Sequence, residues 1–170
     1  VTIYSDSGRS PSTDYRYRVL AFNAGGDSAY SNIANATTLP PPAPAAPSGL
    51  SATPASHTQV DLSWTDNSSS EDGFRIERCT TAGCTSFMEI AAVGPNVMTF
   101  SDSGLAPLTD YRYRIVAFNA GGNSGYSDIA NATTLPPPAS AAPSGLTATP
   151  SSHSQVDLSW TDNSNDEGGF

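Results

Sequence analysis

Apolar and polar residues alternate along several short segments of the chain, which is the pattern of strands with one buried and one solvated face. Between residues 59 and 64 the apolar positions are Val60, Leu62 and Trp64, so these side chains are expected to share an inner face. Strands are predicted over residues 49–53, 59–64, 74–77, 87–93, 97–101, 110–119 and 126–134. Seven short strands without an amphipathic helix predict an all-β sandwich.

The whole pattern recurs after 96 residues. Residues 1–74 align with residues 97–170 without a gap, and 56 of the 74 aligned positions are identical. A unit of this length has the size of a small domain with its own core, so we expect each unit to fold independently. The predicted units are the C-terminal part of one domain (1–39), a complete domain (47–135) and the N-terminal part of another (143–170).

Two proline-rich segments, residues 40–46 and 136–142, bracket the complete unit. Proline restricts φ and leaves few accessible conformations, so both segments are expected to form extended polyproline II connectors. At about 3.1 Å per residue, each connector would hold neighbouring units roughly 20 Å apart. They are predicted to be spacers rather than hinges.

Three features of the complete unit occur in a fixed order. They are Trp64 on the second predicted strand, the Leu-Ala-Pro-Leu-Thr-Asp-Tyr run at 105–111, and the Asn-Ala-Gly-Gly turn at 119–122. Together they resemble the fibronectin type III family, and the run from Trp64 to Arg78 is similar to its bacterial extracellular members. The resemblance covers all 170 residues and implies tandem immunoglobulin-like, seven-stranded β-sandwiches joined by proline-rich linkers.

The resemblance also implies structural roles for individual residues. In the family's tyrosine corner, the phenol of Tyr111 would hydrogen-bond backbone a few residues upstream and fix the crossover between the sheets. Arg9 stands where the complete unit has Leu105, so the corner of the first unit is expected to pack less tightly. The residues expected to have structural roles are Trp64, Pro107, Tyr111 and the repeat partners Tyr15 and Trp160.

The charge composition excludes some classes of function. The chain has no lysine, seven arginines and sixteen acidic residues, for a net charge of −9. Nucleic-acid binding therefore has no electrostatic basis. No segment approaches the ~18 consecutive apolar residues of a membrane span.

The chain contains two cysteines, Cys79 and Cys84. Their short spacing permits a disulfide that closes a hairpin loop, with Gly83 available for a positive φ angle. Two thiols cannot complete a four-ligand zinc site, and the spacing differs from that of a thioredoxin-type pair. A disulfide is favoured over two reduced surface thiols, and it predicts an extracellular or cell-surface location.

One loop has enough oxygen ligands to suggest calcium: Asp66, Asn67, Glu71 and Asp72 lie within seven residues. The loop lacks the fixed alternation and central glycine of an EF-hand, which favours a solvated turn capped by its own side chains. The third unit keeps the acidic character at 162–168, so both interpretations remain open.

No catalytic site and no cofactor are predicted. His57 and His153 occur once per unit, whereas a catalytic triad needs a histidine between a nucleophile and a carboxylate. A glycosidase pair among Glu71, Glu77 and Glu89 would need two carboxyl groups facing each other across a cleft. A sandwich of this size with a filled core offers no such cleft.

Sugars could meet the chain in two ways. Asn35, Asn67 and Asn131 lie in Asn-x-Ser/Thr sequons, which are glycan acceptors in eukaryotic secreted proteins. The bacterial resemblance and the many Asn and Thr residues count against glycosylation. Phe118 and its repeat partner Phe22 are out of phase with the inward residues, so they either contact sugar rings or are covered by neighbouring side chains, and cover is favoured.

The sequence thus favours a non-catalytic structural repeat, a stalk, spacer or filament segment, whose partners are neighbouring repeats of the same chain. The alternative is an accessory or carbohydrate-contacting module of a secreted polysaccharide-degrading enzyme or adhesin. A third hypothesis is that residues 1–39 and 143–170 of successive copies pair end to end into a filament, because unpaired strand edges favour completion. Such a pair would lack the equivalents of residues 75–96.

Overall fold

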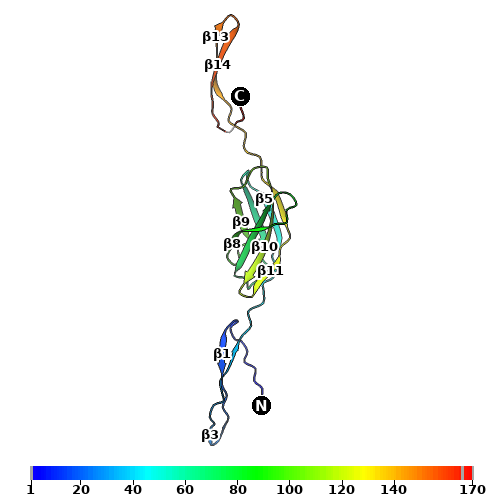
Figure 1. Ribbon diagram of the computed structural model, residues 1–170, viewed down its shortest axis with the longest axis vertical. Coiled ribbons are helices and arrows are strands. Elements are labelled where there is room, and N and C mark those ends of the chain that lie inside the picture. Colours follow the sequence, from blue (N-terminus) through cyan, green and yellow to red (C-terminus); the bar gives the residue numbers. More distant parts are fainter. Residues whose placement is uncertain (1, 166, 170) are drawn as a thin grey trace.

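The computed structural model describes residues 2–165 and 167–169. Three parts follow one another along the long axis of the molecule, a pair of ribbons at one end, a β-sandwich in the middle and a hairpin at the other end (Figure 1). The described part of the chain contains strands and no helix. Accordingly, no described helix is long and apolar enough to cross a membrane.

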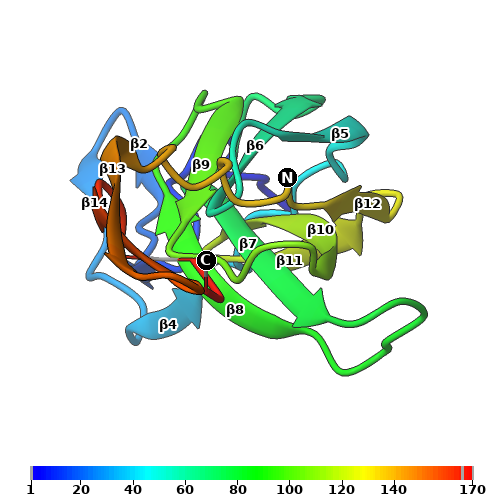
Figure 2. The same cartoon turned by 90° about the horizontal axis from the view of Figure 1, so that it is seen from above.

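The central unit consists of two antiparallel sheets that face each other (Figure 2). The smaller sheet has the order β5-β6-β9, and the larger has the order β11-β10-β7-β8, with β12 also paired to β10. Strands of the smaller sheet are β5 (Ser48–Pro54), β6 (Gln59–Thr65) and β9 (Thr99–Ser103). Strands of the larger sheet are β7 (Gly73–Thr80), β8 (Met88–Val93), β10 (Asp110–Asn119), β11 (Gly122–Tyr126) and β12 (Ala130–Thr133).

The core lies between the two sheets and is closed within the central unit. Burial alternates along β6, where Val60, Leu62 and Trp64 point inward as the sequence predicted. The Trp64 ring meets Phe74 of the opposite sheet edge to face, with 5.7 Å between ring centroids. The other buried members of the core are Ile76, Leu105, Tyr111, Tyr113, Ile115, Ala117 and Ala132.

The prediction of a single strand over residues 126–134 is wrong. It is divided between β11 and β12, which pair with different parts of β10. The hydroxyls of Ser124 and Ser127 accept hydrogen bonds from the backbone N–H groups of Ala117 and Ile115, both at 3.0 Å. These side chains replace the carbonyls of a regular ladder and interrupt it. Strand β9 also begins two residues later than predicted, at Thr99.

The two outer parts repeat portions of the central unit. β1 (Asp14–Tyr17) pairs with β4 (Ala34–Thr37) in the register of β10 with β12. A small hairpin joins β2 (Phe22–Asn23) to β3 (Gly26–Asp27), and β13 (Ser144–Ser152) pairs with β14 (Gln155–Thr161) as β5 does with β6. Their apolar faces are exposed: Leu158 is 58% exposed, whereas its counterpart Leu62 is 2% exposed.

Candidate functional site

The crossover between the sheets is built around Tyr111 on β10. Its phenol oxygen accepts a hydrogen bond of 3.0 Å from the backbone N–H of Ala106, five residues upstream. Tyr15 accepts the same bond, also of 3.0 Å, from the N–H of Ser10. Pro107 lies in this corner, where its carbonyl oxygen accepts a bond from the Thr109 hydroxyl. The arrangement orients the chain as it passes from one sheet to the other.

A buried acid joins the two sheets next to this corner. Asp102 of β9 is 6% exposed and accepts hydrogen bonds from the Tyr113 hydroxyl at 2.9 Å and from Arg78 at 2.8 Å. Burial, with the hydrogen bond to Asp102 and its negative charge, raises the pKa of Tyr113 far above its ordinary value. This cluster was not predicted from the sequence, although an aspartate at an inward position of a strand was its signal.

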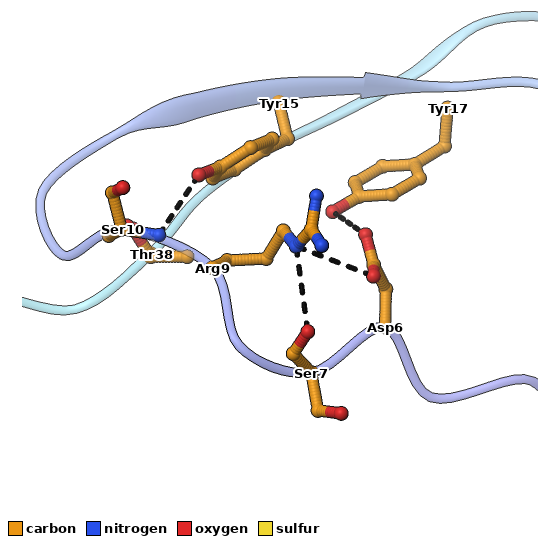
Figure 3. Close-up of polar contacts among 7 residues, drawn as sticks. All are labelled: Asp6, Ser7, Arg9, Ser10, Tyr15, Tyr17 and Thr38. Atoms are coloured by element: carbon orange, nitrogen blue, oxygen red, sulfur yellow. Dashed lines mark hydrogen bonds and ion pairs between the residues drawn. The ribbon is translucent and has the colours of Figure 1, made fainter.

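In the first unit the corner takes a different form (Figure 3). Arg9 lies along the ring of Tyr15, 5.8 Å from its centroid, and pairs with Asp6 at 3.3 Å. Tyr17 donates to the same carboxylate at 3.1 Å. In the central unit the guanidinium above the corner tyrosine comes instead from Arg78, 5.3 Å from the Tyr111 ring. Arg9 and Arg78, at different positions of the repeat, therefore each lie beside an equivalent aspartate–tyrosine pair, Asp6–Tyr17 and Asp102–Tyr113.

A disulfide joins Cys79, at the end of β7, to Cys84, with 6.1 Å between their Cα atoms. The enclosed turn has positive φ angles of 84° at Thr81 and 73° at Gly83. Arg112 of β10 donates a hydrogen bond to the carbonyl of Cys84. The loop is thus attached both to the strand that precedes it and to the neighbouring strand.

The acidic loop at 66–72 forms a capped turn. Asp66 accepts a hydrogen bond of 2.9 Å from the N–H of Ser68, and Asn67 donates to the carbonyl of Ala46 and the hydroxyl of Ser48, both at 2.9 Å. Hydrogen bonds from its own N–H, from Ser68 and from nearby backbone lower the pKa of Glu71, although its burial acts in the opposite direction. Within residues 2–165 and 167–169, no group of three or more His, Cys, Asp or Glu could hold a metal ion.

The three sequons are placed differently. Asn131 and Asn35 are exposed on β12 and β4, and each accepts a hydrogen bond from an arginine Nε, at 3.2 and 3.3 Å. A shallow hollow of about 480 Å³ lies over Asn131 and Thr133, and a similar one of about 520 Å³ recurs over Asn35. Asn67 differs, because its amide nitrogen already donates two hydrogen bonds.

Arginines cover the aromatic rings on the outer face of the larger sheet. Arg114 lies over Tyr126 and Phe87, 3.7 and 4.4 Å from the ring centroids, and pairs with Glu77 at 2.6 Å. The phenol of Tyr126 donates to the same carboxylate at 3.1 Å. On this face, the charged groups and aromatic rings are thus paired with one another within the unit.

An arginine also covers the ring of Phe118. It is half-buried, and the guanidinium of Arg75 lies 4.8 Å from its ring centroid, so a neighbouring side chain covers it. Its repeat partner Phe22, in the first unit, is 81% exposed. Arg75 also approaches Glu89 at 3.8 Å, so Glu77 and Glu89 each pair with an arginine. His57 is half-buried in the turn before β6.

The two facing antiparallel sheets, the tyrosine corner and the buried tryptophan define an immunoglobulin-like β-sandwich. The sequence profile described as "Fibronectin type III domain" matches residues 45–133, and the chain belongs to this family.

Relatives of the chain come from animals and bacteria. Mouse usherin is 30% identical over 94% of this chain, and the Cellulomonas fimi proteins Endoglucanase B and Exoglucanase B are 35% and 33% identical over 76% and 99% of it. The chain spans 3%, 13% and 16% of the length of these relatives. The enzymes therefore match through their fibronectin type III part, which is a non-catalytic module.

Solved structures show the same fold. The FN1–FN3 domains of chicken CNTN1 superpose with a TM-score of 0.55 at 24% identity, covering 78% of this chain and 46% of that one. A segment of titin gives a TM-score of 0.54 at 22% identity, covering 71% of this chain and 40% of that one.

Proposed function

We propose that the chain is a structural segment of an extracellular protein, in which tandem fibronectin type III units form a stalk, spacer or fibre. The observation that carries the proposal is the repeat, in which 56 of 74 aligned residues are identical after 96 positions. The central unit closes its own core. Near-identical complete units of this kind, joined by proline-rich connectors, would give a length that grows with the number of units.

Two further observations support the location and the source of this segment. The disulfide between Cys79 and Cys84 is a bond that persists in oxidising compartments outside the cytosol. The relatives at 33% and 35% identity from Cellulomonas fimi support a bacterial origin.

Small-angle X-ray scattering on proteins with one, two and three copies of residues 40–135 tests the spacer function. These boundaries contain the complete core and one connector. The maximum dimension is expected to rise by an equal step with each added copy. A maximum dimension that grows less with the third copy than with the second would contradict a spacer, because it would indicate collapsed or freely jointed units.

A second candidate is an accessory module of a secreted polysaccharide-degrading enzyme, favoured by the similarity to two bacterial glucanases. A carbohydrate contact would use the exposed aromatic edges of the outer face. Glycan-array binding that is lost on Phe118→Ala would support this function. Because Arg75 covers Phe118, the spacer proposal predicts that neither the unchanged protein nor Phe118→Ala binds a glycan.

The partners proposed for the outer parts are neighbouring repeats of the same chain, or a second copy. The apolar side chains exposed on β14, Val156 and Leu158, correspond to Val60 and Leu62, which β7 and β10 cover in the central unit. The equivalent of β10 in the first unit is β1, so β1 is the proposed surface that complements them. Analytical ultracentrifugation should show self-association of the full chain, whereas a protein of residues 40–135 should remain monomeric.

A further inference from the structure

We infer that the turn between β10 and β11, together with Asn67, is a clasp that holds the incoming proline connector and thereby fixes the orientation of successive units. The inference rests on the proposed spacer function and adds the residues that make the spacer stiff. Three sets of contacts along the connector support it.

Asn119 is the first member of the clasp. Its side-chain amide donates to the carbonyl of Pro42, 77 residues earlier, and to that of Ser70, both at 3.0 Å. Its Oδ1 accepts a hydrogen bond of 2.8 Å from the N–H of Gly121, which orients the amide group. One side chain therefore ties together the connector, the 66–72 loop and the turn.

Gly121 is the second member. A Cβ atom at this position would lie 1.9 Å from the carbonyl oxygen of Pro41, far inside van der Waals contact. The next residue, Gly122, has a φ of 128° and open space around it, so its glycine serves the turn. Gly121 does not have a positive φ angle that would require glycine. The need for glycine at this position is instead explained by the connector, whose backbone lies against it.

Asn67 is the third member and holds the end of the connector. Its amide donates to the carbonyl of Ala46, and Asn163 of the third unit makes the same bond, at 2.8 Å, to Ala142 of the second connector. Pro44, between the contacts at Pro42 and Ala46, is buried, and so is Pro47 directly after them. The same asparagine-to-connector hydrogen bond therefore recurs where the second connector meets the third unit.

The residues just before the connector are held within the preceding unit. The N–H of Ser12 donates to the carbonyl of Leu39 at 3.2 Å, and the Thr38 hydroxyl donates to Ser10 at 2.6 Å. Contacts with the following unit begin at Pro41. Pro40 lies between the two sets of contacts, and its ring restricts φ. The joint therefore has little freedom to act as a hinge.

Heteronuclear {1H}–15N NOE measurements on a protein of residues 40–135 test the clasp directly. In the unchanged protein, the NOE values of Ala43 and Ala45 should equal those of β10. In Gly121→Ala and in Asn119→Ala the value of Ala43 should fall to that of a mobile terminus, whereas Ala45, next to the contact made by Asn67, should keep more of its order. Gly94→Ala is the matched control, because a Cβ there meets nothing within 4 Å, and it should leave both values unchanged.

A protein with two copies of residues 40–135 tests the effect on orientation. Gly121→Ala in the second copy changes the turn that holds the joint, whereas the same substitution in the first copy changes a turn that holds only the free N-terminal connector. Scattering should show a lower radius of gyration for the second-copy variant and an unchanged value for the first-copy variant.

The two measurements separate the inference from the proposed function. A high NOE value for Ala43 that persists in both variants would overturn the clasp, as would identical scattering of the two-copy variants. A collapsed three-copy protein whose Ala43 is nevertheless ordered, and loses that order in Gly121→Ala, would overturn the spacer function and leave the clasp intact.

Discussion

Among single residues, Asp102 has the most consequential environment in the central unit. It is a buried carboxylate that receives Tyr113 and Arg78 from the opposite sheet. Removing either donor leaves the carboxylate of Asp102 buried with one partner fewer, which is destabilising. The cluster therefore connects the two sheets and also makes the stability of the unit sensitive to pH. Its repeat partner Asp6 also binds a tyrosine and an arginine, which indicates that the pairing belongs to the unit.

Tyr113 should make the unit sensitive to alkali. Its folded-state pKa is raised, so its contribution to stability is complete below the unfolded value of about 10 and is lost as pH rises above it. Tyr113→Phe should lower the free energy of unfolding at pH 7 by roughly 1.5–3 kcal/mol, the range for hydrogen bonds to charged groups.

The check is urea unfolding of residues 40–135 at pH 7 and pH 11. Between these conditions the unchanged protein should lose more stability than Tyr113→Phe. Tyr126→Phe is the control, since that hydroxyl is on the exposed outer face. Equal pH dependence of all three proteins would show that Tyr113 does not carry the effect.

At the scale of elements, the longest loop of the larger sheet follows β7 and is closed by the disulfide. The bond connects residues five apart, and Arg112 attaches the closed loop to β10. The β7–β10 ladder is paired along the whole of β7, from Gly73 to Thr80, and so extends well beyond the bond. The disulfide should therefore affect stability and local order without deciding the fold.

Reduction of the disulfide is expected to lower the free energy of unfolding by about 2 kcal/mol, the loop-entropy value for so short a loop. Urea unfolding of residues 40–135 with and without a reductant measures this change. A Cys79→Ser/Cys84→Ser variant should match the reduced protein and be insensitive to reductant. A reductant effect that persists in that variant would show a cause other than this bond.

At the scale of the whole molecule, the same sequence occupies two environments. Residues 59–65 and 155–161 are identical and form β6 and β14, yet β6 is buried by a facing sheet and β14 is exposed. Stability is therefore expected to depend on the partner sheet rather than on the strand itself.

Leu62→Ala should destabilise the central unit by about 3 kcal/mol, the usual cost of a cavity in a packed core. Leu158→Ala, its repeat partner, should change the unfolding of that unit by less than about 0.5 kcal/mol, as exposed substitutions do. Urea unfolding of the full chain, followed by the signal of the central unit, compares the two. Equal costs would mean that the stability of the central unit depends on β14.

Local features of this protein could be predicted from the sequence. The alternation that places Val60, Leu62 and Trp64 inward, the 96-residue repeat and the range of β10 follow from periods and spacings within short segments. The corner bond of Tyr111, which the family resemblance implied, is also local, since it spans five residues. Such features need no knowledge of what lies across the sandwich.

Other features were decided only by the tertiary structure. Serine hydroxyls divide the last strand into β11 and β12, and Asp102 meets Arg78 across 24 residues. The clasp joins Asn119 to Pro42 across 77 residues. Each depends on which backbone or charged group a side chain meets after folding. Local patterns in a single sequence do not reveal these partners, because hydrogen bonds and ion pairs are satisfied through space rather than along the chain.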